Sequence, residues 1–237
     1  MPVPEKTADR PTPSRLPATP RRRLLRLLEL LGLFVCIPAL LSFLPALPVM
    51  PILWIVAAGC GYLLCKDPAF DRASLWRASA AAHWRKALAL HLAVGFSVFY
   101  SLTACWYPEL LFSLVKQHPL LWLTFLLLYP LLSVYPQELI YRTFFFHRYQ
   151  SFFPGRWLSI PVNALLFGYM HIIFRNGVAV GLTIAGGILF AVIYERSRST
   201  LWVSVVHSLY GGLLFTLGLG RFFSRGTLAT ITMAMGF

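Results

Sequence analysis

Four ionisable residues of the sequence are candidates for chemistry at membrane depth, where a charge needs a partner or a function. They are Glu138, Arg142, His171 and His207. A charged side chain at membrane depth costs roughly 2.5–3.5 kcal/mol on insertion scales. A carboxylate and an imidazole can together activate a water molecule, and a second imidazole can bind a developing oxyanion or a metal ion. These residue types therefore predict hydrolytic chemistry, either metal-free or with Zn²⁺ held by Glu138, His171 and His207.

Glu138 and Arg142 are four residues apart, so on a helix they share one face, with the acid on the N-terminal side. One interpretation is an ion pair that only makes both charges tolerable. The other is that Arg142 orients a carboxylate that acts as a base and keeps it ionised. The spacing is compatible with both.

Each histidine taken alone is more often a hydrogen-bonded packing residue than a catalyst. Together with Glu138 they fall on three different apolar stretches, which favours a shared site. With a rise of about 1.5 Å per residue, however, Glu138 is expected near the inner membrane surface and His171 higher up. Their convergence then requires tilted helices, a kink near Pro136, or helices that start later than predicted.

The composition excludes a soluble enzyme with an ordinary polar surface. Of the 237 residues, 58% are apolar and 12% are charged, and the formal net charge is +13, whereas globular domains average about 25% charged residues. Because the basic residues are scattered between apolar stretches, they indicate cytoplasmic loops and not a nucleic-acid surface. The four cysteines have no CxxC spacing and are expected to be packing residues.

The apolar stretches predict an all-α, polytopic transmembrane helical bundle of about seven to eight spans. The expected spans are 27–47, 49–65, 87–106, 119–148, 157–174, 177–194 and 200–219, with a weak eighth helix at 222–237. We expect 119–148 to be one long, tilted or kinked helix.

Three segments follow from this pattern: a disordered, basic, Pro-rich cytosolic tail at 1–26, a transmembrane helical domain at 27–221, and a short C-terminal segment at 222–237. The domain carries its motifs in a core at about 119–219. The arginine cluster ahead of the first span predicts an integral membrane protein with a cytoplasmic N-terminus.

The polar residues, in this order, resemble the CPBP family of intramembrane proteases, which includes type II CAAX prenyl endopeptidases and Abi-type proteins. The family pattern is EExxxR, FxxxH and then HxxxN or a variant, on successive membrane helices. The corresponding residues here are Gln137-Glu138-x-x-x-Arg142, Phe167-x-x-x-His171 and His207-x-x-x-Gly211.

The resemblance implies that a first-motif glutamate and the second-motif histidine activate water. The third-motif histidine and its Asn would stabilise the tetrahedral oxyanion or help to hold a metal. The resemblance also implies a membrane-associated or lipidated peptide or protein substrate, and a location in the lipid bilayer of a bacterial inner (plasma) membrane.

Two positions depart from the family pattern. Residue 137 is Gln where the family usually has the first Glu, and residue 211 is Gly, which lacks the expected side-chain amide. Adjacent helical residues point about 100° apart, so Gln137 and Glu138 cannot simply exchange roles. Either Glu138 serves as the base or the protein is an inactive relative. Backbone N–H groups, Ser208 or Tyr210 could replace the missing amide.

From the sequence we expect an intramembrane endopeptidase. Glu138 would be the general base, His171 its partner on the attacking water, His207 the oxyanion or metal ligand, and Arg142 the orienting residue. A catalytically inactive membrane scaffold or binding protein of the same fold is the alternative. A small transporter is a third hypothesis. The sequence shows no repeated halves, which argues against a transporter.

Overall fold

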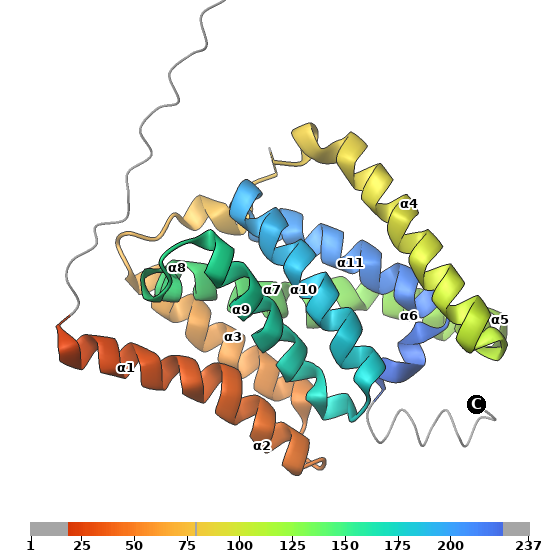
Figure 1. The fold of residues 1–237 in the computed structure, drawn as a ribbon, viewed down its shortest axis with the longest axis horizontal. Helices are drawn as coiled ribbons and strands as arrows, with labels where there is room; N and C mark the ends of the chain where they lie inside the picture. The colour runs from red at the N-terminus through yellow and green to blue at the C-terminus, as the bar shows by residue number, and fades with distance from the viewer. Residues whose placement is uncertain (1–18, 79, 225–237) are drawn as a thin grey trace, which may run out of the picture.

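The computed structural model describes residues 19–78 and 80–224, and within them every regular element is helical (Figure 1). The α-helices are α1 (Pro20–Leu31), α2 (Ile37–Phe43), α3 (Val49–Lys66), α4 (Ala80–Trp106), α5 (Ser113–Gln117), α6 (Pro119–Tyr129), α7 (Tyr135–Glu138), α8 (Phe145–Tyr149), α9 (Arg156–Met170), α10 (Gly177–Ser197) and α11 (Thr200–Thr216). The predicted all-α class is confirmed.

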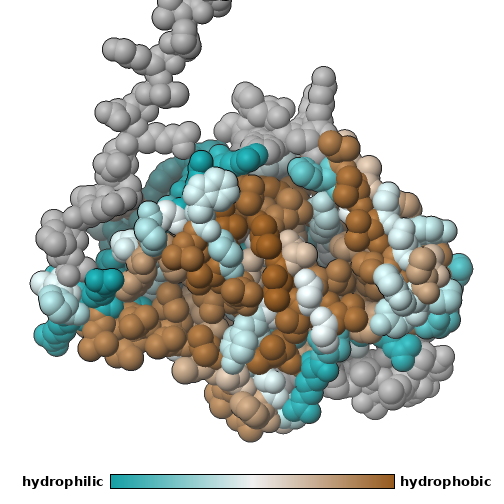
Figure 2. Space-filling view, viewed as in Figure 1, coloured by the Kyte–Doolittle hydropathy of each residue, from teal (hydrophilic) through white to brown (hydrophobic). Residues whose placement is uncertain are grey.

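Six helical stretches are long and apolar enough to cross a membrane, judged by length and composition. They are Pro20–Phe43, Val49–Lys66, Leu88–Trp106, Pro119–Phe152, Arg156–Phe174 and Gly177–Ser197. The shorter apolar helix α11 is the seventh of the predicted spans. Apolar side chains cover much of the face drawn in Figure 2, as expected for a bundle surrounded by lipid.

The predicted boundaries need one correction at the N-terminus. Helix α1 begins at Pro20, so residues 20–26, which we had assigned to the disordered tail, are helical. Proline is favoured in the first turn of a helix, and the leucines and arginines that follow have high helix propensity. Residues 1–18 of the predicted tail and 225–237 of the predicted last helix lie outside the described residues.

The centre of the bundle is formed by α9, α10 and α11, which lie side by side in Figure 1. Helix α10 packs closely on α9 because Gly187 faces Ala164: a Cβ at Gly187 would lie 3.0 Å from the Ala164 Cα. Helix α4 lies at the edge of the bundle and packs on α11. These contacts bring the three motif-bearing segments together.

The long helix Pro119–Phe152 is irregular at two places that flank Glu138. π-Helical turns occur at Pro130–Val134 and Leu139–Phe144, and such turns are frequent at functional sites. Pro136 has no N–H to donate to the Leu132 carbonyl four residues earlier. Instead, Trp54 of α3 donates its indole N–H to that carbonyl at 3.0 Å. The predicted kinked helix is therefore confirmed, and a neighbouring helix satisfies one of its free carbonyls.

Trp54→Phe should destabilise the protein by about 1 kcal/mol, since it leaves the Leu132 carbonyl without this donor. Thermal unfolding in detergent micelles measures the change. Trp106→Phe, at an exposed tryptophan that ends α4, is the matched control. Equal melting temperatures for the two variants would contradict this role of Trp54.

Candidate active site

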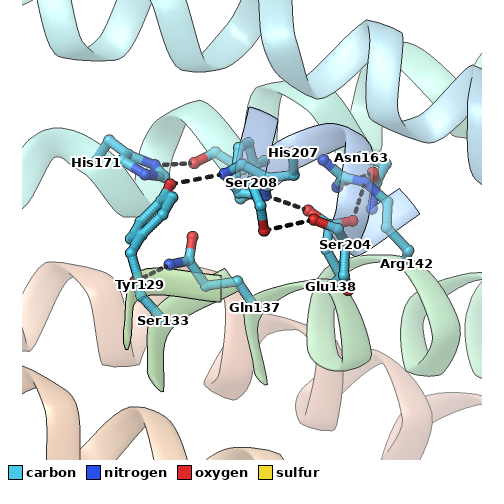
Figure 3. Close-up of polar contacts among 11 residues, drawn as sticks. Tyr129, Ser133, Gln137, Glu138, Arg142, Asn163, His171, Ser204, His207 and Ser208 are labelled. Carbon is cyan, nitrogen blue, oxygen red and sulfur yellow. Dashed lines mark hydrogen bonds and ion pairs between the residues drawn. The ribbon is translucent and has the colours of Figure 1, made fainter. Parts of the chain in front are cut away.

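Glu138 joins two of the motif helices. Its Oε1 accepts a hydrogen bond from His207 Nδ1 at 2.8 Å, and its Oε2 lies 3.3 Å from Arg142 Nε (Figure 3). Glu138 and Arg142 are both fully buried. The spacing of Glu138 and Arg142 predicted that they pair, and this contact is confirmed. Glu138 also contacts His207, which belongs to the third motif.

His207 is positioned by the start of α11. The Ser199 hydroxyl accepts a hydrogen bond from the Trp202 backbone N–H at 3.0 Å and donates one to the Arg77 carbonyl at 2.7 Å. This side chain therefore caps the helix and ties it to the connection before α4. His207 follows about two turns later, with its ring stacked on Phe190 at a centroid distance of 4.5 Å.

Asn163 of α9 adds a second polar contact to Arg142. Its Oδ1 accepts from Arg142 Nη1 at 2.6 Å, and its Nδ2 donates to the Tyr141 carbonyl at 2.5 Å. The Arg142 guanidinium also lies 4.7 Å from the ring centroid of Phe167, a cation–π contact. Our sequence reasoning missed Asn163, although a side-chain amide within an apolar stretch is a recognisable signal.

His171 has one ring nitrogen, Nε2, without a hydrogen-bond partner among the described residues. Its Nδ1 lies 2.7 Å from the Phe167 carbonyl oxygen, and because a carbonyl can only accept, Nδ1 carries the proton. In the neutral ring, Nε2 is then unprotonated, as a general base requires. Helix α9 ends at Met170, and His171 starts the 3₁₀ turn that follows. The His171 side chain lines a cavity.

The cavity has a volume of about 690 Å³ and lies between α4, α6, α10 and α11, within the range of roughly 300–1,000 Å³ typical of ligand sites. Most of its wall is apolar. Polar side chains from the motif helices also line it: Tyr129, Ser133, Gln137, His171 and His207.

Gln137 lines this cavity, whereas Glu138 does not. The Gln137 Nε2 donates to Ser133 Oγ at 2.7 Å, and its carbonyl oxygen points toward the Tyr129 hydroxyl in Figure 3. Both carboxylate oxygens of Glu138 face other protein groups. Gln137 and Glu138 therefore face different surroundings, because adjacent residues of the helix point in different directions.

Tyr129, one turn before Ser133, was also missed from the sequence. Its hydroxyl lies 3.2 Å from His207 Nε2, and its ring stacks on Phe125. The two side chains that we had considered as replacements for the missing amide are engaged elsewhere. Ser208 donates to the Ser204 carbonyl and Tyr210 to the His91 carbonyl.

The proposed Zn²⁺ ligands do not form a shared metal site in this arrangement. Among the described residues, no group of three or more His, Cys, Asp or Glu side chains is placed to hold a metal ion. The Glu138 oxygens contact His207 and Arg142, and His171 Nδ1 is held by a backbone carbonyl. We therefore derive no step through a metal.

Residues 117–213 match the model of the family described as Type II CAAX prenyl endopeptidase Rce1-like. The matched segment contains all three motifs, and it confirms the resemblance drawn from them. No curated protein and no solved structure matches the chain significantly. The apolar helices indicate an integral membrane protein, and residues 117–213 are similar to a family of membrane proteases.

Proposed function

Because residues 117–213 match the type II CAAX prenyl endopeptidase family, we propose that the protein is an intramembrane endopeptidase whose general base is His171. The observation that carries this proposal is the free Nε2 of His171 at the cavity wall. Glu138 is a positioning residue, since it holds His207 through Nδ1 and is itself held by Arg142.

The proposed reaction is the hydrolysis of a peptide bond by water. His171 Nε2 takes a proton from a water molecule that the Gln137 carbonyl oxygen holds, and the water oxygen attacks the peptide carbonyl carbon. His207 lies beside the resulting oxyanion. The C–N bond then breaks as protonated His171 returns its proton to the leaving nitrogen. A carboxyl and an amine terminus result, and His171 is neutral again.

The substrate class follows from the cavity wall. Side chains of Val94, Val98 and Phe99 from α4 and Leu189 from α10 line it, and they suit an apolar tail. We propose a membrane-anchored peptide that carries a lipid or another apolar group. We also propose, from the basic residues at the helix ends, that the N-terminus lies on the cytoplasmic face of the membrane.

The test is cleavage by purified protein in liposomes. Peptides with a prenyl, an acyl or no lipid group are compared between the wild type and Gln137→Glu. We expect the wild type to cleave lipid-bearing peptides most rapidly, because burial of the tail contributes to binding. Equal cleavage of all three peptides would contradict the substrate class, and no cleavage of any would contradict the enzyme function.

A catalytically inactive binding protein is the second candidate, and Gln137 favours it. At this position the cavity has a neutral amide where the family motif has a carboxylate. Cleavage by Gln137→Glu but not by the wild type would identify an inactive relative. Tight binding of the lipid-bearing peptide without cleavage would then define the role of the cavity.

A further inference from the structure

We propose that Tyr129 is a catalytic residue whose hydroxyl donates a hydrogen bond to the oxyanion. The inference rests on the proposed function and adds a group outside the three motifs. The hydroxyl lies 3.2 Å from His207 Nε2 and at the wall of the cavity that also contains Gln137 and His171. A donor in this position faces the space where the carbonyl oxygen of a bound peptide would acquire charge.

Tyr129 occupies the space that a side chain at position 211 would need. A Cβ built on Gly211 would lie 2.8 Å from the Tyr129 hydroxyl oxygen and would overlap its Cε1 atom. Gly211 is also the position at which the third motif lacks its amide. The missing side chain therefore makes room for a hydroxyl from α6, which supplies a hydrogen-bond donor of the kind that is absent.

The position of the protons decides whether this hydroxyl is free to donate. Glu138 accepts from His207 Nδ1. When His207 Nε2 also carries a proton, it donates to the Tyr129 oxygen, and the tyrosine O–H can point into the cavity. The oxyanion then receives the Tyr129 hydrogen bond, while His207 polarises that hydroxyl.

The ring of Tyr129 is fixed by its neighbours, so its hydroxyl does not need to move far to act. It stacks on Phe125 at 4.7 Å and contacts Phe215 at 6.0 Å, centroid to centroid. A donor that is oriented before substrate binds requires little reorganisation during the reaction. The same aromatic contacts remain in phenylalanine, which makes Tyr129→Phe a clean substitution.

Tyr129→Phe should lower kcat by about 10²–10³-fold, the usual effect of removing one oxyanion donor. KM for the membrane-anchored peptide should stay nearly constant, because the cavity is unchanged. Tyr135→Phe is the matched control: Tyr135 lies on the same long helix but outside the cavity, and its hydroxyl donates to the Leu75 carbonyl. Equal kcat for Tyr129→Phe and wild type, or an equal loss in Tyr135→Phe, would overturn the assignment.

Binding of a transition-state analogue separates this role from the proposed function. A phosphonate analogue of the membrane-anchored peptide carries the anionic, tetrahedral group, and we expect Tyr129→Phe to bind it at least 10-fold more weakly than the wild type. An uncharged ketone isostere should bind both proteins equally. Failure of the wild type to cleave would refute only the endopeptidase. Equal phosphonate affinity in the two proteins, or none in either, would refute the role of Tyr129.

Discussion

His171→Gln is expected to lower kcat for cleavage by about 10²–10⁴-fold, the usual contribution of a general base. Glutamine can keep a hydrogen bond to the Phe167 carbonyl but has no nitrogen that accepts a proton at neutral pH. KM should change little, since the apolar wall of the cavity binds most of the substrate. Initial rates in liposomes, over a range of peptide concentrations, separate kcat from KM.

The matched control for this substitution is His147→Gln. His147 belongs to the same long helix as Glu138, but it pairs with Asp67 at 2.9 Å at the basic end of the bundle, outside the cavity. Its replacement should leave kcat within about twofold of the wild-type value. If His171→Gln retained wild-type kcat while Glu138→Gln lost all activity, Glu138 would be the base and our assignment would be wrong.

Glu138→Gln is expected to reduce the free energy of unfolding by about 3–5 kcal/mol, because it leaves the buried guanidinium of Arg142 without a counter-charge. Arg142 and Glu138 are both inaccessible to solvent, so water cannot compensate for the loss. Titration with a denaturing detergent, followed by circular dichroism, measures the change.

A double-mutant cycle isolates the pair from its surroundings. Combining Glu138→Gln with Arg142→Met removes both charges, and the double variant should be more stable than the sum of the single losses predicts. Glu195→Gln is the control, since its partner Arg198 is about one-third exposed and such pairs contribute at most about 1 kcal/mol. Additive losses at residues 138 and 142 would show that the ion pair has no stabilising role.

Much of the architecture follows from the sequence because the bilayer restricts it strongly. Apolar length predicted the spans, and the helix from Pro119 to Phe152 is long and irregular, as Pro136 suggested. The start of α1 was less predictable. A run of prolines and arginines resembles a disordered tail until the preference of proline for the first helical position and the helix propensity of the residues after Pro20 are considered.

The sequence predicts the candidate residues of the site but not the directions of their side chains. Motif order selected His171 and His207, and both line one cavity, but the direction of each side chain depends on helix rotation. The two π-helical turns around Glu138 alter that rotation, and no residue pattern in the sequence predicted these turns. Tyr129 could not be found from spacing because it contacts His207 across 78 positions of the chain. The sequence feature that points to Tyr129 is the glycine at position 211, because the Tyr129 ring fills the space of the missing side chain. This feature is informative only once the packing is known.

Cleavage in water enriched in heavy oxygen tests the central claim most directly. Purified wild-type protein and His171→Gln are incubated in liposomes with a lipid-bearing, membrane-anchored peptide, and the products are analysed by mass spectrometry. The account predicts that the wild type releases a fragment with one heavy oxygen in its new carboxyl group, and that His171→Gln releases almost none. No cleavage by the wild type, or equal cleavage by both proteins, would contradict it.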